Sequence, residues 1–344
     1  MRWKERPPGS NWGDFGSDDQ LGRLNYLTAE RVMQAAAEIR TGRRFCLSLP
    51  LDLPGGNALS PRRFPPELKP TTRQDGRLSM NYPFSLFDPN LTDVVCDDLA
   101  TIHLQYSTQW DSFAHIGSLF DADADGRPEI VYYNGYRAHE DIIGPARYGE
   151  EGEPPVEGRK PGVWKLGIDT FAATPIQGRG VMIDLESHFG RALRHITYAD
   201  IAAVMEKDSV EVEKGDLVCF RTGYAQALLD MGGKPDRKVL RNFPELDGDD
   251  PRLLEWITNS GIAALVCDSF SIDKLRKNVA ACCSMVPIHE LCLFKLGIPL
   301  GELWYLSELA DWLRANKRSR FFLTAPALRL PGAAGSPLTP VATV

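Results

Sequence analysis

Several features of membrane, nucleotide-binding and nucleic-acid-binding proteins are missing from this sequence. It has no apolar run near the roughly 18 residues of a membrane-spanning helix, and residues 1–8 lack the apolar core of a signal peptide. It also has no G-x-x-x-x-G-K-[ST] loop and no complete G-x-G-x-x-G fingerprint. Its 39 Lys and Arg residues are outnumbered by 46 Asp and Glu, which argues against a nucleic-acid partner or a membrane partner. We therefore expect a cytoplasmic protein that acts on a small molecule.

The cysteines also lack the patterns of disulfide-rich and zinc-binding proteins. Their number, seven, is odd, and they form no C-x-x-C pair. Several lie in apolar runs, where a reduced thiol behaves as a small hydrophobic group. The adjacent Cys282 and Cys283 have no neighbouring basic residue in the sequence that would activate a thiol, so we expect them to be buried rather than nucleophilic.

The composition is that of a globular protein, with 43% apolar and 25% charged residues in 344. The first part of the chain is irregular. It contains one helix, which we expect to begin after Thr28 and to end at Thr41 and Gly42, and a strand over 45–53. Residues 54–90 are rich in Pro, Gly and Asn, which is typical of a long surface excursion, and such excursions often cover an active site.

From about residue 178 onward, short apolar strands alternate with capped helices. The predicted strands cover 180–185, 216–220, 262–268 and 298–306, and the predicted helices begin near Thr197, Pro251 and Pro287. This alternation predicts an α/β fold. We expect a single domain, in which 1–100 form an irregular N-terminal arm and loops and 101–344 form the α/β core.

Gln105 to His115 is the segment richest in chemically active groups. It places amide, hydroxyl, carboxylate and imidazole groups within a few residues of one another. If the chain runs as a strand into a tight turn, positions 105, 109, 111 and 115 converge. An edge strand with a hydrogen-bonded aspartate and a core histidine explains the same residues, so the segment alone leaves both interpretations open.

A second acidic segment, Asp121 to Gly126, begins like a calcium-binding loop. The position that requires a bidentate glutamate holds Tyr132, however, so we expect an acidic turn.

The sequence resembles the metal-dependent cyclases and kynurenine formamidase-like hydrolases, a family that includes isatin hydrolase-like enzymes and has the signature H-x-G-T-H-x-D-x-P-x-H. The resemblance extends over nearly the whole chain, through 11–13, 18–25, the signature segment, 180–185, 215–223 and 335–337. It implies a swivelling β/β/α fold with the N-terminal extension described above. It also implies a homo-oligomer, either a dimer or a tetramer.

Carried across from that family, the signature aspartate is Asp111, a metal ligand, and the last signature histidine is His115, the acid/base. The distant metal-binding pair of the family corresponds to His289 and Glu302. The sequence departs from the signature at four positions, where its two metal-binding histidines, its glycine and its proline are replaced by Gln105, Gln109, Ser107 and Phe113.

These departures change the expected metal site. A glutamine offers a neutral amide oxygen, which Zn²⁺ or Mn²⁺ binds less tightly than an imidazole nitrogen. We therefore expect one divalent ion, Mn or Zn, held by Asp111, His289 and Glu302 with one coordination position open. His289 falls in the first turn of its helix, where the helix dipole favours the neutral imidazole. The expected substrate-binding or water-orienting residues are Gln105, Ser107, Gln109, Trp110 and Arg221.

The resulting hypothesis is a metal-dependent hydrolase of the amidohydrolase or formamidase type. It would cleave an amide, cyclic amide or lactone bond of a small aromatic or cyclic substrate, with His115 as general base. Two alternatives remain open. The same site could carry out dehydration or ring closure, or the glutamines could abolish metal binding and leave a non-catalytic small-molecule binding protein.

Overall fold

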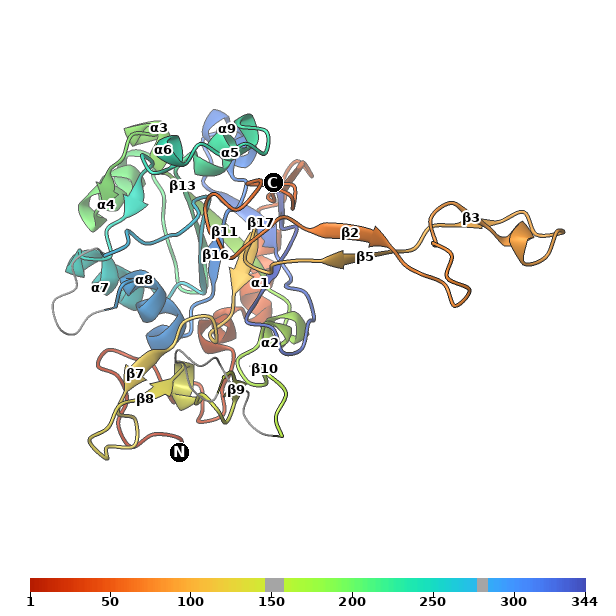
Figure 1. Cartoon of the computed structure of the whole chain (residues 1–344). Coiled ribbons are helices and arrows are strands. Elements are labelled where there is room, and N and C mark those ends of the chain that lie inside the picture. The colour runs from red at the N-terminus through yellow and green to blue at the C-terminus, as the bar shows by residue number, and fades with distance from the viewer. Residues whose placement is uncertain (146–157, 277–283) are drawn as a thin grey trace.

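The computed structural model describes residues 1–145, 158–276 and 284–344. Its centre is a sheet of nine strands in which residues from both ends of the chain meet (Figure 1). In spatial order the strands are β1 (Arg44–Cys46), β19 (Val341–Thr343), β17 (Arg320–Thr324), β11 (Gln177–Asp184), β13 (Leu217–Arg221), β15 (Ala264–Cys267), β16 (Leu300–Glu302), β6 (Gln109–Asp111) and β18 (Gly335–Pro337). The α/β class and single-domain architecture expected from the sequence are confirmed.

Four parallel strands, β11, β13, β15 and β16, form the middle of the sheet. Their register aligns Val181, Val218, Leu265 and Leu300 in one row, and all four side chains are fully buried. Apolar strands of this kind are typical of a sheet covered on both faces. Because the strands are parallel, the polar residues at their carboxyl ends lie along one edge, where α/β proteins commonly bind ligands.

Helices connect and cover these strands. They are α1 (Ala29–Ala36), α2 (Ile168–Ala173), α3 (Leu185–Phe189), α4 (Tyr198–Lys207), α5 (Tyr224–Asp230), α6 (Arg237–Leu240), α7 (Pro251–Ser260), α8 (Pro287–His289) and α9 (Ser307–Ala315). The predicted caps are confirmed: Thr197 forms a capping box with Asp200, and α7 begins at Pro251 after Asp250 and ends before Gly261. Among the described residues, no helix has both the length and the apolar content to cross a membrane.

A π-helix, η4 (Glu290–Leu296), continues α8 and ends at Gly297. Gly297 has a φ of 56°, and a Cβ there would lie 2.7 Å from the Cα of Gly22. Both the backbone conformation and this close approach therefore require glycine. Short 3₁₀ turns are η1 (Gly22–Tyr26), η2 (Phe84–Leu86) and η3 (Tyr133–Gly135).

Two of the N-terminal predictions need correction. The helix after Thr28 ends at Ala36, because the amides of Glu38 and Ile39 bond to carbonyls three residues back instead of continuing the α-helix. The strand expected over 45–53 is confined to β1, because beyond Cys46 the chain leaves the ladder with β19 and Ser48 forms only an isolated bridge with Trp304. The prediction for Cys282 and Cys283 lies outside the described residues.

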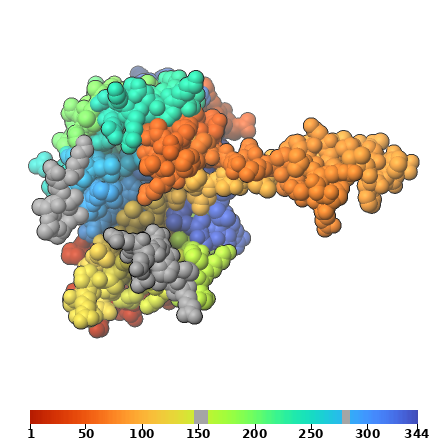
Figure 2. Space-filling model, viewed as in Figure 1, coloured from red at the N-terminus to blue at the C-terminus, as the bar shows by residue number. Residues whose placement is uncertain are grey.

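The long surface excursion is an extended arm that projects from the body of the molecule (Figures 1 and 2). Its stem pairs β2 (Glu67–Pro70) with β5 (Asp98–Thr101), and its outer part pairs β3 (Tyr82–Pro83) with β4 (Val94–Val95). Three further two-stranded pairs lie elsewhere: β7 (Ser118–Phe120) with β8 (Glu129–Val131), β9 (Ile142–Ile143) with β10 (Gly162–Val163), and β12 (His195–Ile196) with β14 (Glu245–Leu246).

Candidate metal centre

The pairing of β6 with β16 builds the first half of the centre. Their antiparallel register places Gln109 opposite Glu302 and Asp111 opposite Leu300. Because side chains alternate along a strand, Gln109 and Asp111 share one face of β6. The amide nitrogen Nε2 of Gln109 donates a hydrogen bond to Oε2 of Glu302, at 3.2 Å.

His289, the last residue of α8, completes a group of three candidate ligands with Asp111 and Glu302. One ligand atom from each residue lies within 4.8 Å of the other two. The Nε2 atom of His289 is 3.3 Å from Oε1 of Glu302. The three residues are 0%, 5% and 4% exposed for Asp111, His289 and Glu302, so the sequence-predicted ligands meet in a buried site.

The surroundings of the two Asp111 side-chain oxygens indicate whether these residues can bind a cation. Neither Oδ1 nor Oδ2 has a hydrogen-bond partner among the described residues, and the same is true of the amide oxygen of Gln109. Burial raises the pKa of Asp111, and the nearby carboxylate of Glu302 raises it further. A buried carboxylate without donors is costly unless a cation or a proton compensates it, so the group fits a divalent ion with oxygen and nitrogen ligands.

Asp273 fixes the orientation of His289. Its Oδ2 lies 2.6 Å from Nδ1 of the imidazole, and its two oxygens also accept the backbone amides of Ile288 and His289. Nδ1 therefore faces the carboxylate and Nε2 faces Glu302, which is the arrangement commonly found in carboxylate–histidine–metal groups. Burial lowers the pKa of His289, but the hydrogen bonds with Asp273 and Glu302 outweigh it, so the pKa lies well above its usual value.

His115 lies beside this group without belonging to it. Its Nδ1 is 3.8 Å from Oδ1 of Asp111, and its ring centroid is 6.4 Å from that of His289. Its side chain is 21% exposed, whereas the three candidate ligands are buried. The imidazole is thus placed between the buried carboxylate and solvent, as a proton-transfer group requires.

Comparison with known families agrees with this geometry. The Cyclase family model matches residues 47–274, which is more than half of the chain. The chain belongs to the cyclase family. The crystal structure of a novel cyclase superposes with a TM-score of 0.73 at 29% identity and covers 97% of this chain and 99% of that chain. Membership of this enzyme family supports an enzymatic role and confirms the resemblance drawn from the sequence.

Two isatin hydrolases share the fold of this cyclase-family chain at low identity. Isatin hydrolase A from Labrenzia aggregata, bound to benzyl benzoate, has a TM-score of 0.55 at 14% identity and covers 91% of this chain and 98% of its own. Isatin hydrolase A from Ralstonia solanacearum has a TM-score of 0.52 at 16% identity and covers 91% of this chain and 95% of its own. A search of curated proteins gives no match.

Gln105 and Ser107, which were expected to bind substrate or orient water, lie in the segment before β6. Gln105 lies against β18, because a Cβ on Gly335 would be 2.6 Å from its Nε2. Ser107 is buried, and its hydroxyl donates to the carbonyl of Pro50 at 3.3 Å. Both residues therefore support the segment that leads into β6, and Gln109 alone of the two glutamines bonds to a candidate ligand.

Trp110 occupies the opposite face of β6 from Gln109 and Asp111. It is fully buried, its ring centroid is 4.9 Å from that of Trp304, and its Nε1 donates to the carbonyl of Ala325. Strand alternation thus directs this residue into the core rather than toward a ligand.

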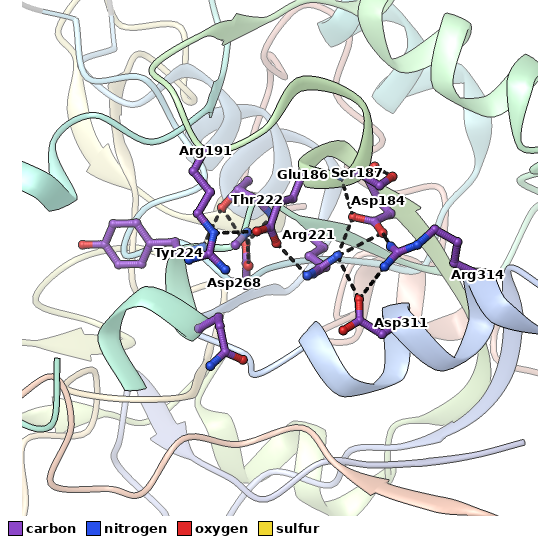
Figure 3. Close-up of polar contacts among 12 residues, drawn as sticks. Asp184, Glu186, Ser187, Arg191, Arg221, Thr222, Tyr224, Asp268, Asp311 and Arg314 are labelled. Carbon is purple, nitrogen blue, oxygen red and sulfur yellow. Dashed lines mark hydrogen bonds and ion pairs between the residues drawn. The ribbon is translucent and has the colours of Figure 1, made fainter. Parts of the chain in front are cut away.

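Arg221 is also not brought to the candidate ligands. It lies at the end of β13, two strands and about 10 Å of sheet from β16. Its guanidinium contacts Asp184 at 3.0 Å and Glu186 at 2.7 Å (Figure 3). We call the surrounding group of ion-paired side chains the Arg221 cluster: Asp184, Glu186, Asp311, Arg191, Arg221 and Arg314.

Asp268, next to this cluster, fixes the turn that follows β13. Its two oxygens accept hydrogen bonds from the backbone amides of Thr222 and Gly223 and from the Thr222 hydroxyl (Figure 3). Burial raises the pKa of Asp268 to about 6, while these hydrogen bonds oppose the rise. Gly223 has a φ of 84°, and a Cβ there would lie 2.5 Å from the carboxyl carbon of Glu186, so the turn needs glycine.

A second acidic group outside the centre consists of Asp121, Asp123 and Glu129. Two oxygens of Asp121 accept the backbone amides of Asp125 and Gly126, as in an acidic turn, and Glu129 pairs with Arg137. These contacts agree with the turn predicted from the missing glutamate.

Two residues that act on the centre, Asp273 and Arg63, were not predicted from the sequence. Asp273 lies 16 residues before His289, and its signal was weak: an acidic residue a few positions after a buried strand. Arg63 donates to the carbonyl of Gln105 at 2.6 Å, and its charge interacts with Asp111 and Glu302. Arg63 comes from the Pro- and Gly-rich excursion, where no pattern distinguished it from its neighbours.

Proposed function

We propose that this cyclase-family chain is a metal-dependent hydrolase that cleaves an amide, cyclic amide or lactone bond of a small cyclic or aromatic molecule. The observation that carries the proposal is the buried carboxylate of Asp111, whose two oxygens lack donors and face His289 and Glu302. A formamidase-like amide bond and a ring amide such as that of isatin are the first substrates to test, since isatin hydrolases share the fold.

Asp111, His289 and Glu302 would hold one divalent ion, Mn or Zn. When bound, such an ion supplies Lewis-acid polarisation of a carbonyl and makes a water molecule a stronger acid. Asp273 keeps Nε2 of His289 directed toward Glu302, so the ligand atom does not have to be reoriented. The amide oxygen of Gln109, which has no partner among the described residues, is available to orient a substrate or a water.

His115 would act as the general base. Its imidazole lies 3.8 Å from Asp111, so a water held near that carboxylate is within reach of a ring nitrogen. The protonated imidazole would then return its proton to the leaving nitrogen or oxygen.

Two other functions use the same residues. The family name favours dehydration or ring closure as an alternative, and product analysis separates this from hydrolysis, because hydrolysis consumes one water per turnover. A binding protein without metal is the second alternative, and it predicts no ion in the purified chain.

The decisive experiment is elemental analysis of protein purified without added metal, followed by assays with isatin and an aryl formamide. We expect about one ion per chain and hydrolysis that a chelator abolishes. The variant His115→Ala should keep its metal and lose turnover by roughly 10²–10⁴-fold, the usual contribution of a general base. Full activity in this variant would remove His115 from the mechanism, and a metal-free active enzyme would refute the proposal.

We also propose that the chain forms a homo-oligomer through its arm, residues 64–101. The side chains of Leu68, Leu78, Phe87 and Val94 on the arm are 68%, 56%, 85% and 59% exposed. A two-stranded ribbon with its apolar side chains in water is only marginally stable, so burial against a second copy would compensate it. Sedimentation of the full chain against a Phe87→Ser and Leu68→Ser variant tests this, and a monomeric full chain would contradict it.

A further inference from the structure

A cavity of about 220 Å³ adjoins the metal centre. One wall is the segment after β15, from Ser269 to Asp273. The same segment also builds the centre, because Asp273 holds His289 and the amide of Ile272 donates to Glu302 at 3.0 Å. The cavity and the candidate metal ligands therefore share this segment, and Asp273 contributes to both.

The remaining walls are largely aromatic. Tyr224 and Phe243 are both buried and make an edge-to-face contact with ring centroids 5.2 Å apart. Phe270 lines the cavity from the segment after β15, and Leu240 from α6. Walls of this kind suit a flat ring, which makes edge and face contacts with aromatic side chains, and the volume limits the ligand to a small one.

Two arginines line the same cavity. Arg237 begins α6 and Arg241 follows it directly, so their four-residue separation places both side chains on one face of this turn. Both side chains are exposed, and neither guanidinium forms an ion pair with another described residue, whereas Arg221, Arg276 and Arg314 are each ion-paired. The acidic lining residues are accounted for: Asp273 is occupied by His289 and its neighbouring amides, and Glu245 has a partner.

We infer that this cavity binds the ring of an anionic substrate, whose carboxylate pairs with Arg237 and Arg241. A ring packed against the Tyr224–Phe243 pair would have its charged group at α6 and its other end at the 269–273 wall, next to the metal ligands. Arginine is suited to this task because its planar donors can meet a carboxylate in a bidentate arrangement. The inference rests on the proposed hydrolase function and names the substrate class of that site.

Binding of benzoate and of its neutral analogue benzamide to the metal-loaded full chain tests the inference by calorimetry. We expect benzoate to bind roughly 10- to 100-fold more tightly than benzamide, as a charge-assisted hydrogen bond implies. The double variant Arg237→Ala and Arg241→Ala should lose this preference, and the double lysine replacement at the same positions should keep part of it. The matched control is Lys234→Ala with Lys238→Ala, which removes two exposed positive charges that do not line the cavity.

Equal affinities for benzoate and benzamide would overturn the inference, as would an equal loss in the lysine control, which would indicate only a long-range charge effect. Its failure is distinguishable from failure of the proposed function. A chain that lacks metal but prefers benzoate through both arginines keeps the anion site and loses the hydrolase mechanism. A metal-dependent hydrolase that binds benzoate no better than benzamide keeps the mechanism and loses the anion site.

Discussion

The candidate metal centre and the Arg221 cluster are two groups of charges near the same edge of one sheet, the first buried and the second partly exposed, and they are balanced in opposite ways. In the cluster, the carboxylates of Asp184, Glu186 and Asp311 each face at least one arginine. In the centre, Asp111 has no donor for either oxygen among the described residues, and Glu302 and Asp273 add further negative charge around His289.

This difference separates a structural group from a ligand-binding group. Ion pairs of this kind hold strand ends and turns in place, because each carboxylate already has a cationic partner. A buried carboxylate without a partner destabilises the protein until something binds it. The contrast therefore favours the centre, rather than the more conspicuous arginine-rich cluster, as the proposed site of chemistry.

The substitution Asp111→Asn is expected to have the largest effect on the candidate metal centre. Without the carboxylate, metal content should fall below about a tenth of an ion per chain, and hydrolysis should fall by on the order of 10³-fold or more. The metal-free variant should be at least as stable as the metal-free parent, because a buried carboxylate that accepts no hydrogen bond has been removed. Elemental analysis and urea unfolding measure the two effects, and a destabilised metal-free variant would contradict the assignment.

Arg221→Ala should show the reverse pattern. It leaves the buried carboxylates of Asp184 and Glu186 without their central partner, so the free energy of unfolding should fall by about 3–5 kcal/mol while the metal content of the folded protein stays unchanged. Arg191→Ala is the control, because Arg191 contacts the same Glu186 from a half-exposed position and should cost about 1 kcal/mol or less. Loss of metal in Arg221→Ala would show that the two groups are not independent.

The raised pKa of Asp268, next to the Arg221 cluster, should make the free energy of unfolding depend on pH. Its pKa of about 6 in the folded protein lies above the ordinary aspartate value of 3.8, so between these two pH values the folded state holds the proton more tightly than the unfolded state does. Its contribution to stability is therefore complete below about pH 4 and is lost as the pH rises through about 6, by at most about 3 kcal/mol. Unfolding free energies of the parent and of Asp268→Asn across this range should differ in slope, and parallel profiles would refute the raised pKa.

The smallest expected effect is a gain. Gln109→His places an imidazole beside Glu302 and Asp111, where an amide now stands, so affinity for Zn²⁺ should rise by roughly 10-fold. The control is Gln105→His, because Gln105 packs against β18. This variant should change the affinity for Zn²⁺ less than Gln109→His does. Competition with a chelating dye measures both constants, and an unchanged affinity in Gln109→His would place that side chain outside the metal's reach.

Local rules in the sequence accounted for much of the fold. The apolar runs before Asp184, Arg221 and Asp268 predicted the parallel strands, because a strand buried on both faces must be apolar throughout. The caps of α4 and α7 were predictable because side chains such as those of Thr197 and Asp250 satisfy amides only two or three residues away. The arm was expected only as a surface excursion, since its pairing of β2 with β5 depends on residues about 30 positions apart.

The sequence by itself determined the strand and helix pattern, the family, and the three residues offered as metal ligands. Only the tertiary structure decided which neighbours act on them: it brought Asp273 and Arg63 to the centre, turned Trp110 into the core, and enclosed Arg221 among acids. The physical reason is that alternation and capping operate over a few residues, whereas charge balance in a buried site depends on side chains that long-range strand pairing brings together.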